Sequence, residues 1–225
     1  KLLLAIVGGR RGSTTTLNAM SIGGEDCVGV GSATADGSGE ATTLGYGHIL
    51  NDNHPGSGGQ TILPSFGSGL SNIVYTAVEL SGVNQTNPVE TPITVVGTDL
   101  ADGAGLSVNV SGHDGKMAVV WASSCSGSDN DGAGGNGLPA GAVSLGDYPY
   151  GRNRVHVGYI AALASNDEDL AFTFSTDGSA IAQSATAGAL VINDTTEGNP
   201  EGIDSVSGDN VIVSGESVTV DWFSG

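Results

Sequence analysis

Positive charge is scarce in this sequence. Its 225 residues include 6 Lys and Arg against 24 Asp and Glu, which gives a formal net charge of −18. A surface of this sign repels a phosphate backbone, so the sequence argues against a nucleic-acid partner. The same charge opposes unspecific association, which suits a particle or filament exposed to a salty exterior.

Cysteine is rarer still, with Cys27 and Cys125 as the only two. Two cysteines are too few for a disulfide scaffold, and their spacing matches no metal or redox motif. We expect two buried free thiols, because free Cys packs as a small hydrophobic residue. A single disulfide between them stays open as the alternative.

Long apolar runs are also missing. The opening stretch KLLLAIVGG has about six apolar residues in a row, far fewer than a signal-peptide core or a membrane span requires. We therefore expect a buried strand at 2–7 and no membrane partner. Because the first residue is Lys1 rather than Met, we also expect the natural N-terminus to lie upstream.

No convincing helical stripe occurs, whereas short apolar or alternating runs recur between clusters of Gly, Asn, Asp and Pro. This pattern predicts an all-β, jelly-roll-like sandwich. Aromatic residues make up only 5% of the chain, so we expect Trp121, Trp222, Phe172, Phe174 and Tyr159 to carry much of the core. The predicted strands are 2–7, 15–22, 26–31, 42–50, 72–80, 92–97, 105–111, 116–122, 154–163, 169–175, 180–192, 204–207, 210–214 and 217–223.

Two turn-rich segments, 51–69 and 123–153, are too long for hairpin connections and are predicted to be functional loops. The second contains Arg152 and is followed by Arg154. In so acidic a chain, we expect these two arginines to form salt bridges between subunits.

The C-terminal part is expected to extend from a sandwich domain that covers residues 1–192. An acidic linker is predicted at 193–203, followed by a β-hairpin at 204–225. A lone hairpin is marginal, so it must pair back onto the sandwich or dock on a neighbouring subunit, and we favour the neighbour. A weak likeness between 105–112 and 211–220 is interpreted as shared hairpin composition.

Candidate catalytic and metal-binding patterns are weak. The four histidines, His48, His54, His113 and His156, show no spacing typical of a metal site. Asp129, Asn130 and Asp131 resemble part of a calcium loop, but the closing Glu and the alternating ligand spacing are missing.

Three further acids, Asp167, Glu168 and Asp169, are read as a solvated turn rather than as the paired carboxylates of a glycoside hydrolase. No serine lies in a nucleophile elbow. We predict no catalytic, cofactor-binding or metal site and no cofactor.

The stretches VYTAVELSGVNQTNPVE (74–90) and VHVGYIAALASNDEDLAFTFSTDGSAIAQSATAGALVI (155–192) resemble strands and turns of β-sandwich virion proteins from tailed bacteriophages. With the opening strand, the resemblance covers roughly residues 1–192. It implies a virion structural role, with jelly-roll subunits that often assemble as trimers. It carries over no functional residue.

The leading hypothesis is therefore a non-enzymatic capsid decoration or cement protein, a homotrimer in contact with a major capsid protein. Deleting 204–225 would then leave a folded monomer that no longer binds particles. One alternative is an extracellular filament subunit that polymerises by strand donation. The other is a carbohydrate-binding or adhesive module, for which Tyr148 and Tyr150 would form the sugar platform.

Overall fold

The computed structural model describes residues 1–11, 14–37, 40–50, 58–126, 135–164, 169–175, 183–193, 202–209 and 218–222, the last two ranges as backbone alone. Every regular element in these ranges is a β-strand, which confirms the predicted all-β sandwich. In the described ranges there is no helix with the length and hydropathy needed to cross a bilayer.

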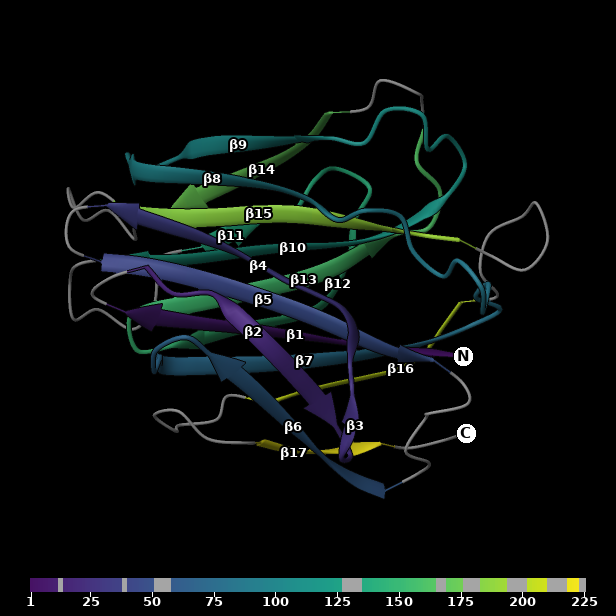
Figure 1. The fold of residues 1–225 in the computed structure, drawn as a ribbon. Helices are drawn as coiled ribbons and strands as arrows, with labels where there is room; N and C mark the ends of the chain where they lie inside the picture. Colours follow the sequence, from purple (N-terminus) through teal and green to yellow (C-terminus); the bar gives the residue numbers. More distant parts are fainter. Residues whose placement is uncertain are drawn as a thin grey trace.

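The strands form four antiparallel sheets (Figure 1). We call the first half of the molecule β1–β7 with β16 and β17, and the second half β8–β15; each half has an inner and an outer sheet. Inner sheet 1 has the order β16 (Gly202–Asp209), β7 (Ser71–Ser81), β1 (Leu2–Arg11), β5 (Glu40–Leu50), β4 (Val28–Gly37). Outer sheet 1 has the order β17 (Val218–Trp222), β6 (Gly58–Phe66), β2 (Leu17–Ile22), β3 (Glu25–Asp26). Inner sheet 2 has the order β12 (Val143–Tyr150), β13 (Asn153–Ile160), β10 (Met117–Ser126), β15 (Gln183–Ile192), β8 (Ile93–Leu100). Outer sheet 2 has the order β11 (Gly135–Gly137), β14 (Asp169–Ser175), β9 (Ala104–Asn109).

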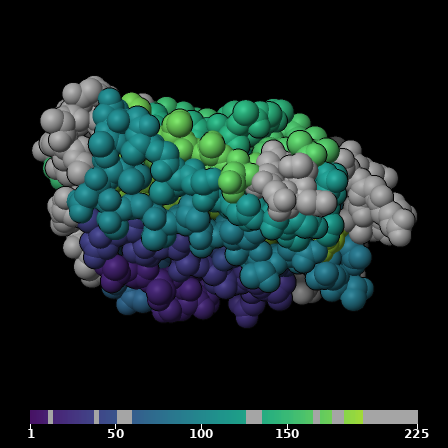
Figure 2. Space-filling model, turned by 90° about the horizontal axis from the view of Figure 1, so that it is seen from above, coloured from purple at the N-terminus to yellow at the C-terminus, as the bar shows by residue number. Residues whose placement is uncertain are grey.

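The sheets stack in four layers, with a hydrophobic core between each neighbouring pair. The central core lies between the two inner sheets and contains Leu4 and Ile6 from β1 together with Val119 and Trp121 from β10. A second core separates inner from outer sheet 1, and a third separates inner from outer sheet 2. In Figure 2 the purple N-terminal strands and the green β13–β15 region accordingly lie on opposite sides of the molecule.

The central strands of the inner sheets are buried on both faces, which explains the continuous apolar runs in the sequence. Every residue of β15 is buried, and so is every residue of β1 from Leu2 to Gly9. An antiparallel sheet usually has one solvated face and an alternating pattern. Here the outer sheets cover the second face, so the alternation disappears. The ambiguous segment 180–192 is confirmed as a strand from Gln183 onward.

The expected aromatic core is confirmed for Trp121, Phe172 and Phe174, which are fully buried. Tyr159 is half-buried and packs against the central core. The side chain of Trp222 lies outside the described part of the structure.

The prediction of two long loops is wrong for much of their length. β6 occupies Gly58–Phe66, and the segment 123–153 contains the end of β10 together with β11 and β12. These strands lie in outer sheets or at a sheet edge, so few of their residues need to be apolar. Pro64 and Pro149 are compatible with such positions, where a missing N–H breaks no central ladder.

The C-terminal strands pair with the first half rather than with each other. β16 lies antiparallel to β7, with Val206 opposite Val78, and β17 lies antiparallel to β6, with Val218 opposite Ile62. These two described strands belong to different sheets of the same chain, and the turn of the predicted hairpin lies outside the described residues, so the hairpin stays a prediction. Docking of 204–225 on a neighbouring subunit stays a prediction.

Candidate assembly interface

The edges of the inner sheets are irregular in a systematic way. Each pairing between an edge strand and its neighbour contains a register shift, seen for β4 with β5, β12 with β13, β8 with β15 and β16 with β7. A β-bulge twists an edge and leaves a residue unpaired, which hinders the addition of a further strand. These edges therefore oppose open-ended growth by strand addition.

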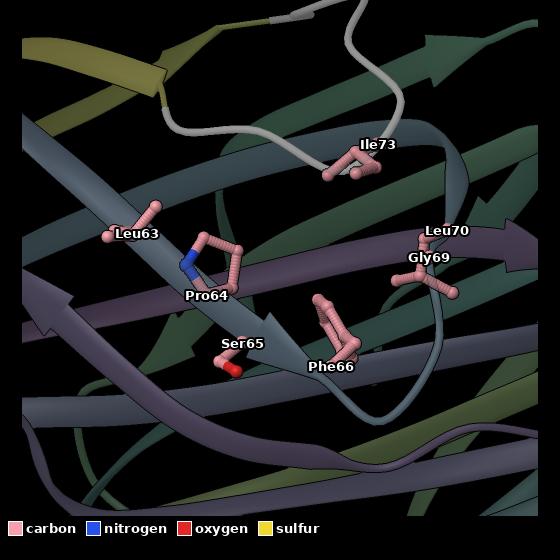
Figure 3. A pocket seen from close by; sticks show the side chains of 7 residues that line it. All are labelled: Leu63, Pro64, Ser65, Phe66, Gly69, Leu70 and Ile73. Carbon is pink, nitrogen blue, oxygen red and sulfur yellow. The ribbon is translucent and has the colours of Figure 1, made fainter.

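An apolar groove of about 380 Å³ opens between the end of β6 and the start of β7 (Figure 3). Leu63 and Phe66 line it from β6, Leu70 lines it from the segment just before β7, and Ile73 lines it from β7 itself. Leu63 is 50% exposed. An exposed apolar hollow on a polar, acidic surface is typical of a contact site for another protein. Pro64, Ser65 and Gly69 complete the lining.

Among the described residues, His48, His113 and His156 do not come together as a metal site. His48 is buried in β5, where desolvation lowers its pKa. His156 lies in the other half, where its Nδ1 donates to the carbonyl of Asn136 (2.5 Å) and its Nε2 lies 2.9 Å from the Ser144 hydroxyl. His54 lies outside the described residues. Within the described ranges no three His, Cys, Asp or Glu side chains are grouped to hold a metal ion.

Most candidates for a calcium loop or an acidic turn lie outside the described residues, so these interpretations stay predictions: Asp129, Asn130, Asp131, Asp167 and Glu168. Asp169 is described, at the start of β14. Its Oδ1 accepts a hydrogen bond from Nδ2 of Asn109 on β9 at 3.0 Å. This carboxylate therefore links two strands of outer sheet 2.

Neither cysteine forms a disulfide, as expected. Cys125 is buried in β10, whereas Cys27 is half-buried between β3 and β4. Burial, followed by the nearby charge of Asp26, raises the pKa of Cys27 to about 12. A thiolate is the reactive form of Cys, so this thiol is poorly suited to nucleophilic chemistry near neutral pH.

Arg154 forms its ion pair within the chain. Its Nε donates to Oδ1 of Asp147 at 2.7 Å across the β12–β13 pair, and this hydrogen bond raises the arginine pKa. The expected role of Arg154 in a bridge between subunits is therefore not supported. The corresponding expectation for Arg152 stays a prediction.

Tyr148 and Tyr150 are half-buried and pack against the central core. Sugar platforms expose flat aromatic faces, but these two side chains contribute to the packing between the inner sheets. The carbohydrate-binding alternative stays a prediction.

Sequence reasoning missed the groove because it placed β6 inside a loop. The alternation of Ile62, Pro64 and Phe66 was the available signal, obscured by the surrounding glycines and serines. In comparisons with known proteins, no family model, no curated protein and no solved structure matches this chain.

Proposed function

We propose that the chain is a non-enzymatic structural protein of a virion, a capsid decoration or cement protein that assembles as a homotrimer on the outside of a phage particle. The observation that carries this proposal is that the edges of the sheets are bulged or covered by the chain's own strands. All four edge pairings of the inner sheets are bulged, and the edges of β7 and β6 are occupied by the chain's own β16 and β17. A subunit of this kind favours closed assembly over an open filament.

The chemistry of the described residues supports the same role. His48, His156, the two thiols, Asp169 and Arg154 are buried, half-buried or engaged in structural contacts. The Ser144 hydroxyl does lie 2.9 Å from Nε2 of His156, and we interpret this pair as a structural link between the neighbouring strands β12 and β13. Three stacked hydrophobic cores suit a rigid structural subunit that acts through the surface it presents to other subunits.

The groove lined by Leu63, Phe66, Leu70 and Ile73 is the contact we propose between copies in the trimer. Its half-exposed Leu63 would be covered by the neighbouring subunit. Removing apolar area from water contributes about 25 cal/mol per Å², so a charge at this position would oppose assembly while leaving the fold intact.

We expect Leu63→Asp to reduce the mass measured by light scattering from trimer to monomer at micromolar concentration, with an unfolding midpoint close to that of the parent. Val143→Asp is the matched control, because Val143 is also 50% exposed but lies on β12 in the second half. Equal masses for the parent and the Leu63→Asp variant would remove the groove from the assembly interface. A lower mass for both variants would indicate a general effect of added charge.

A further inference from the structure

The two halves of the molecule have the same strand order. Inner sheet 1 reads β16-β7-β1-β5-β4, and inner sheet 2, taken from its other edge, reads β8-β15-β10-β13-β12. The outer sheets correspond as β17-β6-β2 and β9-β14-β11. Along the chain, β1, β2, β4, β5, β6 and β7 thus match β10 to β15 in unbroken order. Only β3 has no counterpart among the described strands.

A bulge occurs at the same place in both halves. In the first half the register shifts between Val28 and Gly31 of β4, opposite β5; in the second it shifts between Ser144 and Gly146 of β12, opposite β13. The sequences at these bulges are VGVG (28–31) and VSLG (143–146). A β-bulge shifts the pairing register at one defined position. Two unrelated hairpins are not expected to share a bulge at the same position.

The register from the bulge aligns the remaining strands. Gly31 lies opposite Tyr46, which lies opposite Ile6; correspondingly, Gly146 lies opposite Val157, which lies opposite Trp121. Ile6 and Trp121 are thereby equivalent, and both point into the central core.

Identical residues follow from the same alignment. Gly47 and Ile49 in β5 match Gly158 and Ile160 in β13, and Lys1 matches Lys116 immediately before the first central strand. No residue was chosen to produce these matches, because the bulge alone sets the register.

The packing between the halves has the same symmetry. β4, at the edge of inner sheet 1, packs against β8 at the edge of inner sheet 2, and β12 packs against β16 at the opposite edges. Val28 and Val143 hold equivalent positions and have similar exposures of 53% and 50%. The halves are thus related by an approximate two-fold arrangement.

We infer that the chain contains two copies of one β unit in tandem. The sequence starts inside the first copy, after the two strands that would lead it, and those two strands follow the second copy instead. The second unit is contiguous, β8 to β15. The first unit is split, so that β16 and β17, although last in the chain, are the counterparts of β8 and β9. Residues 202–222 therefore act as the leading strand pair of the first unit. The likeness between 105–112 and 211–220 then reflects a repeat, in place of the shared composition inferred from the sequence alone.

This assignment defines a specific interaction surface. The adjacent edges of β7 and β6 form an acceptor site for a strand pair, as the edges of β15 and β14 do for β8 and β9. The partner that fits is the leading strand pair of the unit, whichever copy of the unit it comes from. A strand pair from another part of the unit should not fit.

A graft into the full chain tests the inference. Residues 202–222 are replaced by the sequence of 93–109, and in a matched control by the β12–β13 sequence 143–160, which is also a strand pair of similar length. Amide hydrogen exchange in β7 is the readout. We expect exchange within about tenfold of the parent for the 93–109 graft and at least about 100-fold faster exchange for the control. Similar exchange in the two grafts, fast or slow, would overturn the assignment.

A circular permutant tests the same inference without changing any strand. The original ends are joined by a Gly-Ser linker and the chain is opened between Thr86 and Asn87, which are exposed. The order then becomes β8 to β15 followed by β16, β17 and β1 to β7, two complete units in sequence. We expect one cooperative unfolding transition and the β7 protection of the parent. A permutant that fails to fold would overturn the duplication even if the graft succeeds.

Discussion

Gly188→Val is expected to destabilise the protein by about 3 kcal/mol, because this position has no room for a side chain. A Cβ atom at Gly188 would lie 2.6 Å from two atoms of the Trp121 indole, which is fully buried in the central core. Indole rings and strand backbones in a packed core cannot move apart without losing contacts on their other sides. Urea denaturation followed by far-UV circular dichroism measures the loss.

A double variant that also replaces Trp121 tests this contact more directly. Trp121→Ala alone is expected to cost about 3–5 kcal/mol through loss of burial and the cavity left behind. In the double variant the valine partly fills that cavity, so the combined cost should fall below the sum of the single costs by about 1 kcal/mol or more. Gly69→Val is the control, because a Cβ atom there meets no atom within 4 Å. Additive costs would contradict direct packing between Gly188 and Trp121.

Ending the chain at residue 201 is expected to lower the unfolding midpoint by about 10 °C or more, which for a chain of this size corresponds to about 3 kcal/mol. The truncation removes β16 and β17 and leaves the edges of β7 and β6 without strand partners. Exposed, unpaired edges also template association. Light scattering should therefore show a mass that rises with concentration, where the sequence alone predicted a folded monomer.

A chain ended at residue 222 is the matched control, because it keeps both strands. It should retain the midpoint and the mass of the parent. If the chain ended at 201 is as stable as this control and stays at a single mass, β16 and β17 contribute nothing to the first half. The proposed acceptor site would then fail with them.

Much of the fold was predictable because the central strands of the inner sheets can be recognised in the sequence. The runs that became β1, β7, β10 and β15 are apolar at nearly every position, and no helical stripe competes with them. Their number suggested one sandwich, however, where the structure has three cores. A search for alternating apolar and polar residues could not show that both faces of β15 are buried. That burial depends on outer strands far away in the sequence.

The strands that the sequence did not predict were missed for one physical reason. β6, β11 and β12 lie in outer sheets or at an edge, where Gly, Ser and Pro are tolerated, so their composition resembles that of loops. The groove beside Leu63 was lost together with β6. The pairing of β16 with β7 also escaped prediction, because a strand at residue 206 carries no local signal for a partner at residue 78.

The central claim is that the chain is a closed building block that assembles to a finite size. The mass of the full chain, measured by size-exclusion chromatography with light scattering over a hundredfold dilution series, tests it most directly. The account predicts one discrete mass, that of a trimer, with no larger species at the highest concentration. A continuous series of masses that grows with concentration would contradict it and would favour a filament subunit instead.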